Sequence, residues 1–185
     1  MKPLHRARPW HVAVTILLAL STVAVVAAAK LSQTGTSNTT FKVSTSSQSF
    51  SGKAADMTTA DDGTTVTITV KLGTLSTGVP LRDEKTKAAL EVDKYPTVVL
   101  RVARSALKFP GAGDQVDTNA RGQLTLHGQT KALTFQYTAE LNSGAYDISG
   151  EMTINLNDFG LKPPSYLGQM VKPDVVIQTK FQVRD

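Results

Sequence analysis

The sequence carries few side chains that could act together as acid, base or nucleophile. It has three histidines, His5, His11 and His127, and no cysteine. Any histidine-dependent reaction in the main part of the chain would therefore depend on His127 alone. No G-x-S-x-G motif, which marks many serine hydrolases, accompanies it. We predict no catalytic residue, no metal site and no cofactor.

His127 stands beside Gly128 in the segment LHGQT, a composition typical of a tight turn. We expect its ring to hydrogen-bond to nearby backbone. Two other roles stay open, namely ligand contact and pH sensing, because histidine titrates near neutral pH. A hydrolase or isomerase that uses His127 as a base is a further hypothesis. It predicts that His127→Ala abolishes an activity and leaves the fold intact.

Two other groups of residues could bind or react. Arg82 and Asp83 open a segment of good helix formers, where Asp83 suits the positive end of the helix dipole. The two can pair locally, or Arg82 can lie at the mouth of a binding site and meet an anionic head group. Asp158-Phe159-Gly160 matches a kinase triplet, but no Gly-rich or catalytic loop accompanies it. We expect Phe159 to face the protein interior.

The positive charge is concentrated at the N-terminus. The formal net charge is +5, but Lys2, Arg6 and Arg8 account for three charges, which leaves 17 basic and 15 acidic residues. No block of Lys and Arg follows, so we predict no nucleic-acid partner. The lack of cysteine excludes disulfides, thiolate metal sites and an acylated lipoprotein anchor.

The N-terminal residues 1–29 have the marks of a secretory signal peptide. A basic start is followed by the uncharged residues 12–29, which end in three alanines before Lys30. The alternative is an uncleaved anchor, because 18 such residues just suffice to span a bilayer. Either way we expect a periplasmic or secreted protein, with membrane contact only through residues 12–29. We predict a Ser/Thr-rich linker over 30–40 and one domain over 41–185.

Period-two alternation of apolar and polar residues dominates that domain. In the segment 64–72, for example, Val66, Ile68 and Val70 fall on one face and threonines on the other. Regular alternation of this kind predicts antiparallel strands with one wet face and one covered face. The same pattern recurs over 97–104, 122–127, 132–141, 146–156 and 175–183.

A sheet with one polar face, and without a layer of helices to cover the other, must cover itself. We therefore predict an all-β fold, an antiparallel lipocalin-like β-barrel of about eight strands, because closure also removes exposed edges. The segment 81–92 interrupts the alternation and predicts one short helix, which Tyr95-Pro96 ends. Hairpin turns are expected at 127–131 and 142–144.

Several motifs occur in an order that resembles the YceI-like proteins. They are Thr77-Gly78 with Arg82-Asp83, then Tyr95-Pro96, then Leu126-His127-Gly128-x-Thr130, then Asp158-Phe159-Gly160. The resemblance covers roughly residues 41–185. It implies a periplasmic or secreted antiparallel barrel that encloses a long apolar chain, such as an isoprenoid or a fatty amide.

Two segments depart from the family's pattern. Members often begin with a strand that carries a His-Ser pair, whereas this chain has NTTFKVSTSSQSFSG. Members often carry an arginine before the Asp-Phe pair, whereas this chain has Asn155-Leu156-Asn157. Both departures concern polar contacts to a ligand head group.

The expected partner is an apolar, lipid-like small molecule held for carriage or storage. Sparse aromatic residues among the inward positions favour space for it, although an eight-stranded barrel can equally fill with side chains. The alternative is thus a filled barrel that serves as a structural or interaction module of the cell envelope. The sequence indicates no oligomeric state. The predicted ligand-binding residues are Ile68, Val70, Val98, Leu100, Val102, Leu124, Leu126, Phe135, Tyr137, Ile154, Phe159, Ile177 and Phe181, with Arg82 for a head group.

Overall fold

A closed antiparallel barrel forms the body of the protein. The computed structural model describes residues 30–163, 165–166 and 169–184. Eight strands hydrogen-bond in a ring, and the last strand pairs with the first, which confirms the predicted fold class. Around the ring the strands are β1 (Ser32–Thr45), β3 (Met57–Asp61), β4 (Thr65–Lys71), β6 (Thr97–Ala103), β7 (Gln115–Leu126), β8 (Gln129–Asn142), β9 (Ala145–Asn155) and β11 (Gln169–Arg184).

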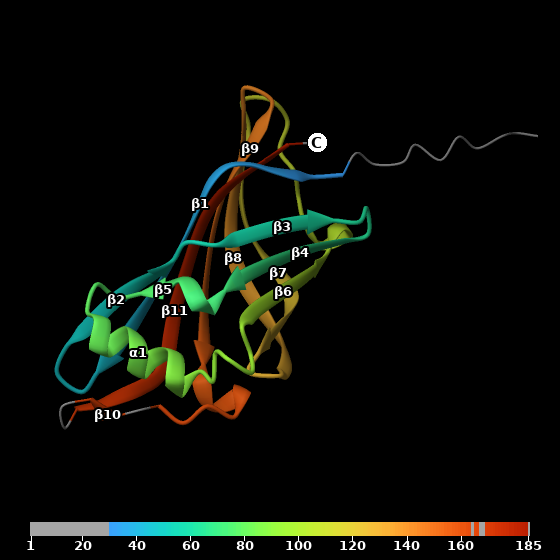
Figure 1. The fold of residues 1–185 in the computed structure, drawn as a ribbon. Helices are drawn as coiled ribbons and strands as arrows, with labels where there is room; N and C mark the ends of the chain where they lie inside the picture. The colour runs from blue at the N-terminus through green and yellow to red at the C-terminus, as the bar shows by residue number, and fades with distance from the viewer. Residues whose placement is uncertain (1–29, 164, 167–168, 185) are drawn as a thin grey trace, which may run out of the picture.

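Shorter elements extend the sheet and cover one end of it. Strand β2 (Ser49–Ala54) pairs with β1, β5 (Leu75–Ser76) pairs with β2, and β10 (Ser165–Tyr166) pairs with β11. Helix α1 (Pro80–Ala89) and β10 both lie at the end of the barrel away from the turn between β8 and β9 (Figure 1). The other helical elements are the 3₁₀ turns η1 (Leu72–Thr74), η2 (Arg104–Ala106) and η3 (Leu156–Phe159).

The alternation in sequence becomes an inward and an outward face on each long strand. On β4 and β6, Val66 lies opposite Val102 and Ile68 opposite Leu100, while Thr67 lies opposite the exposed Arg101 on the other face. Val102 and Leu100 are almost fully buried. Burial of each such side chain contributes about 1.5–3 kcal/mol relative to exposure, so the pattern fixes the register.

The predicted helix and hairpin turns are present with small shifts in their bounds. Pro80 occupies the first turn of α1, and the helix ends at Ala89 rather than at residue 92. Its last turn continues as a backbone turn that brings Tyr95 N to the Glu91 carbonyl, 2.8 Å away. The β7–β8 turn is tight because His127 and Gly128 both adopt positive φ, 51° and 72°, as two-residue hairpins favour.

The predicted linker over residues 30–40 is wrong. Residues 32–40 belong to β1, which pairs with β11 from Ser32 opposite Arg184 to Phe41 opposite Ile177 and beyond. Threonine suits strands, and serine and threonine fit the wet face of a half-buried sheet, so a Ser/Thr-rich composition does not oppose this pairing. A register shift after Thr34, where Gly35 has φ 70°, disguises the alternation.

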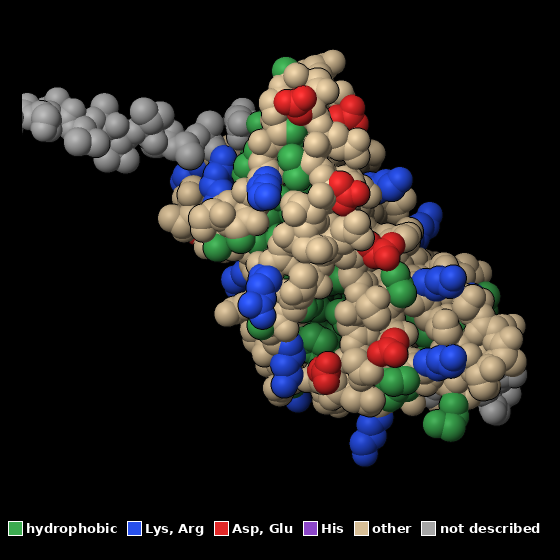
Figure 2. Space-filling model, turned by 180° about the vertical axis from the view of Figure 1, so that it is seen from behind, with side chains coloured by type: hydrophobic (Ala, Val, Ile, Leu, Met, Phe, Trp, Pro, Cys, Tyr) green, Lys and Arg blue, Asp and Glu red, His purple; other side chains and the backbone are tan. Residues whose placement is uncertain are grey.

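The predicted signal peptide or anchor, residues 1–29, lies outside the described residues. Within the described part of the chain, no helix has the length and hydropathy needed to cross a membrane. On the face shown in Figure 2, basic and acidic side chains are interspersed rather than gathered by sign.

Candidate ligand-binding cavity

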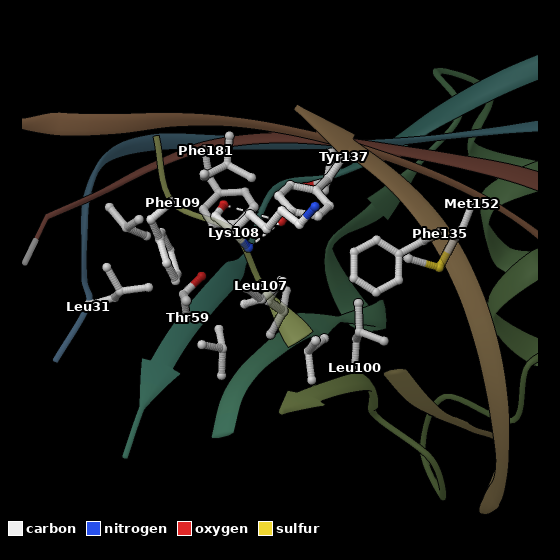
Figure 3. Close-up of a pocket in the computed structure, with 17 residues that line it drawn as sticks. Leu31, Thr59, Leu100, Leu107, Lys108, Phe109, Phe135, Tyr137, Met152 and Phe181 are labelled. Atoms are coloured by element: carbon white, nitrogen blue, oxygen red, sulfur yellow. Dashed lines mark hydrogen bonds between the residues drawn. The ribbon is translucent and has the colours of Figure 1, made fainter. Parts of the chain in front are cut away.

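Among the described residues, inward side chains of the barrel strands line two apolar cavities. The first, here called the cap-side cavity, has a volume of about 70 Å³. Residues 107–109, here called the cap segment, line it together with inward side chains of the barrel strands (Figure 3). Its lining residues are Leu31, Thr59, Val66, Ile68, Leu100, Val102, Leu107, Lys108, Phe109, Phe135, Tyr137, Ile148, Gly150, Met152, Thr179, Phe181 and Val183.

The second, here called the helix-side cavity, has a volume of about 150 Å³. Thr86 and Leu90, from α1 and the residue after it, contribute to its wall. The other lining residues are Thr39, Phe41, Val43, Ala54, Val70, Leu72, Leu75, Val98, Leu126, Ile154, Leu156, Val175 and Ile177.

The two cavities are successive levels of one barrel interior. Inward residues on a strand are two positions apart, and on four strands one such step passes from the cap-side to the helix-side cavity. The boundary between the cavities lies at these four steps, and side chains rather than backbone separate the cavities there. The steps are Ile68 to Val70, Leu100 to Val98, Met152 to Ile154 and Thr179 to Ile177.

Most of the predicted ligand-binding residues line one of these two cavities. Leu124 and Phe159 are buried in the core but line neither cavity. Arg82 also lines neither. The predicted residues in the cap-side cavity are Ile68, Leu100, Val102, Phe135, Tyr137 and Phe181, and those in the helix-side cavity are Val70, Val98, Leu126, Ile154 and Ile177.

Sequence reasoning missed the contributions of the first strand and of the loops. Thr39, Phe41 and Val43 on β1 line the helix-side cavity, and their alternate spacing was the available signal. The cap segment carried no such signal, because Leu107 and Phe109 lie in an irregular stretch.

The cap segment is held in place by specific polar contacts. The Tyr137 hydroxyl accepts a hydrogen bond from the Lys108 amide at 2.6 Å and donates to the Lys108 carbonyl at 3.2 Å. Arg104 pairs with the fully buried Asp61 carboxylate, and its guanidinium lies 5.3 Å from the Phe109 ring centre. These contacts connect the cap segment to β8 and to the end of β3.

Arg82 and Asp83 converge on Thr77 rather than on a cavity. Arg82 donates from Nε to the Thr77 hydroxyl at 2.8 Å and also lies over the Phe50 ring. Asp83 accepts hydrogen bonds from the Thr77 hydroxyl, the Thr77 amide and the Ser76 hydroxyl. These donors, the Thr77 hydroxyl first, hold the pKa of Asp83 below its usual value. The pair thus fastens the start of α1 to β5.

His127 bonds to backbone, as one of the expected roles requires. Its Nδ1 lies 3.2 Å from the Phe159 carbonyl oxygen. Its ring contacts the Tyr95 ring edge-on, with the two ring centres 4.5 Å apart. Nε2 lies 3.1 Å from Glu91 Oε1, but the two groups are not aligned for a hydrogen bond. The contact is an ion pair only when the ring is protonated. His127 lines neither cavity.

A closed eight-stranded antiparallel barrel with an apolar interior defines a class of small barrels that can hold one ligand. Comparison with known proteins agrees with this class. The chain matches the YceI-like domain family over residues 19–183 and belongs to that family.

Both sequence relatives and solved structures are similar to this chain. A UPF0312 protein of Pseudomonas putida (strain W619) is 31% identical over 122 residues, which cover 61% of this chain and 60% of that protein. A polyisoprenoid-binding domain from Saccharophagus degradans, implicated in plant cell wall breakdown, has a TM-score of 0.70 at 14% identity, covering 84% and 97% of the two chains. BcnA from Burkholderia cenocepacia has a TM-score of 0.64 at 14% identity, covering 79% and 95%. At such identities the structural likeness shows the fold.

Proposed function

We propose that this chain binds one long apolar lipid inside the barrel, for carriage or storage outside the cytoplasm, without changing it chemically. The observation that carries the proposal is the pair of apolar cavities at successive levels of one interior. The structurally similar Saccharophagus degradans domain is described as polyisoprenoid-binding, which supports a ligand of isoprenoid or fatty-acyl type.

The length of the interior suits an extended chain. Val183 lines the cap-side cavity and Val175 the helix-side cavity, both on β11. Eight residues of strand span about 26 Å along the strand, and the interior is correspondingly shorter along the barrel axis because the strands are tilted. Each methylene transferred from water into such an interior contributes about 0.8 kcal/mol, so a long chain needs little polar recognition.

The size of the cavities sets a condition on binding. Volumes of about 70 and 150 Å³ are below the roughly 300–1,000 Å³ of typical ligand sites. The side chains between the cavities must therefore rotate to admit a continuous chain. Met152 lines the cap-side cavity at this boundary, and methionine adapts readily because it is unbranched.

Ile68→Trp tests whether the boundary lies on the ligand's path. The larger ring would occupy the junction of the two cavities, so we expect the affinity for a fluorescent long-chain alcohol to fall about tenfold or more, the equivalent of about 1.4 kcal/mol. Thr67→Trp is the matched control, because it places the same ring on the outer face of the same strand. Equal binding by both variants in a titration would contradict the proposal.

A filled barrel that acts through its surface is the second candidate, and the small cavity volumes favour it. In that case Ile68→Trp overpacks the core and lowers the free energy of unfolding by about 1–3 kcal/mol, and the unmodified protein binds no long-chain probe. Denaturant unfolding beside the binding titration separates the two candidates.

We also propose that the protein is exported from the cytoplasm. It is supported by the basic start and the uncharged run of residues 12–29. Fractionation of a bacterial host that expresses the full chain tests it. The intact mass of the exported protein then shows whether residues 1–29 have been removed or still anchor the chain.

A further inference from the structure

One hydroxyl in the wall of the cap-side cavity has no hydrogen-bond partner. Thr59 lies on β3 opposite Ile68, and its Oγ1 is shielded from solvent without a partner among the described residues. In Figure 3, Thr59 lies between Phe109 and Leu107, with its hydroxyl directed into the enclosed space. Burial of a hydroxyl without a partner is unfavourable, so this position invites a polar ligand atom.

The other threonine of this cavity differs from Thr59. Thr179 exchanges a hydrogen bond with Thr39 at 3.2 Å and contacts Met57 Sδ, also at 3.2 Å. Its hydrogen-bonding capacity is thus used within the protein. Gln33 Oε1 and Thr34 Oγ1 are likewise shielded and unpartnered, but neither residue lines the cap-side cavity.

The charges near the cavity favour an uncharged ligand group. Lys108 is the charged residue that lines the cavity, and it is exposed. Asp61 and Arg104, at the same end of the barrel, pair with each other. A charged head group buried at Thr59 would therefore have no buried counter-ion among the described residues, which is costly.

We propose that the Thr59 hydroxyl hydrogen-bonds to an uncharged oxygen-bearing end of the ligand, a hydroxyl, carbonyl or amide, while the apolar chain runs from the cap-side into the helix-side cavity. The inference rests on the proposed function and adds to it the ligand's chemical class and its direction in the barrel. A pure hydrocarbon leaves Thr59 unsatisfied, and a carboxylate or phosphate fits it poorly.

The test compares two probes of equal length, hexadecanol and hexadecane, on the wild type and three variants by calorimetric titration of the exported protein. Thr59→Val keeps the shape and removes the hydroxyl. We expect it to weaken hexadecanol binding about three- to tenfold and to leave hexadecane binding unchanged, as the loss of one net hydrogen bond implies. Thr59→Ser should retain the affinity for hexadecanol, and the outward-facing control Thr67→Val should leave both affinities unchanged.

Three results would overturn the inference. Equal effects of Thr59→Val on both probes would show that the hydroxyl does not contact the ligand, while the binding function would stand. A marked loss of thermal stability in ligand-free Thr59→Val would assign the hydroxyl a structural role, since removal of an unpartnered buried hydroxyl should leave stability equal or higher. Failure of the wild type to bind either probe would overturn the proposed function together with this inference.

Discussion

At the start of helix α1, the side chains of two adjacent charged residues hydrogen-bond to the same threonine. The guanidinium of Arg82 donates to the hydroxyl and the carbonyl of Thr77, and Asp83 accepts from its amide and hydroxyl. The sequence suggested both a local role and a head-group role for Arg82. The contacts are local, but among the described residues Arg82 and Asp83 meet on Thr77 rather than pair with each other. The head-group role of Arg82 stays a prediction.

Asp83→Asn should make the attachment of α1 less sensitive to acid. The pKa of Asp83 is lowered in the folded protein from 3.8, so the carboxylate stabilises the fold above that pH and its contribution is lost as pH falls through the folded pKa. We expect the wild type to melt at a higher temperature than Asp83→Asn at pH 7, with the difference narrowing below about pH 4.

The control for this prediction is Glu84→Gln, which removes an exposed carboxylate from the next position of the helix. Thermal unfolding followed from pH 7 down to pH 3 compares the three proteins. A difference between wild type and Asp83→Asn that is constant over this range would show that the charge of Asp83 does not fasten the helix.

Single residues also mark the limit of what alternation can predict. Strand β3 was not recognised in the sequence, because it is short and its inward positions Met57, Thr59 and Asp61 include only one apolar side chain. Asp61 is buried through its pairing with Arg104, which is distant in sequence. The polar features of the cavity wall thus depend on tertiary contacts that no local pattern specifies.

At the scale of elements, the close approach of β2 to β1 and β5 limits one position to glycine. A Cβ on Gly52 would meet the Phe41 ring and would lie 2.8 Å from the Ser76 carbonyl oxygen. Phe41 lines the helix-side cavity, so displacement of its ring changes that cavity directly.

Gly52→Ala should therefore lower the free energy of unfolding by about 1–3 kcal/mol, the usual range for overpacking. It should also weaken binding of a long-chain probe, because Phe41 is pushed from its place. Gly73→Ala is the matched control, since a Cβ there meets nothing within 4 Å. Chemical denaturation of the two variants measures the difference, and equal stabilities would refute the predicted clash.

The elements that the sequence predicted correctly are those with strong alternation or clear turn chemistry. Strands β4, β6, β8, β9 and β11, the helix and both hairpin turns follow from residues that pack or bend locally. Strand β1 could not be predicted over its first half, because its pairing with β11 is made between opposite ends of the chain. The inward residues Thr39, Phe41 and Val43 lie in its second half and were missed although their alternate spacing was visible in the sequence.

At the scale of the whole molecule, closure of the barrel encloses both cavities in one interior. The ring closes where β1 pairs with β11, and inward residues of the strands line both levels. Membership of the YceI-like family and the fold shared with the Saccharophagus degradans domain agree with a closed barrel of this kind. The central claim is that this interior holds one long apolar molecule.

Native mass spectrometry of the protein, exported from a bacterial host that expresses the full chain and followed by organic extraction, tests this claim most directly. The account predicts an added apolar mass at one per chain, which extraction recovers as an isoprenoid or fatty-acyl compound with an uncharged polar end. The mass of the bare chain, unchanged after incubation with isoprenoid and fatty-acyl mixtures, would contradict it and favour a filled barrel.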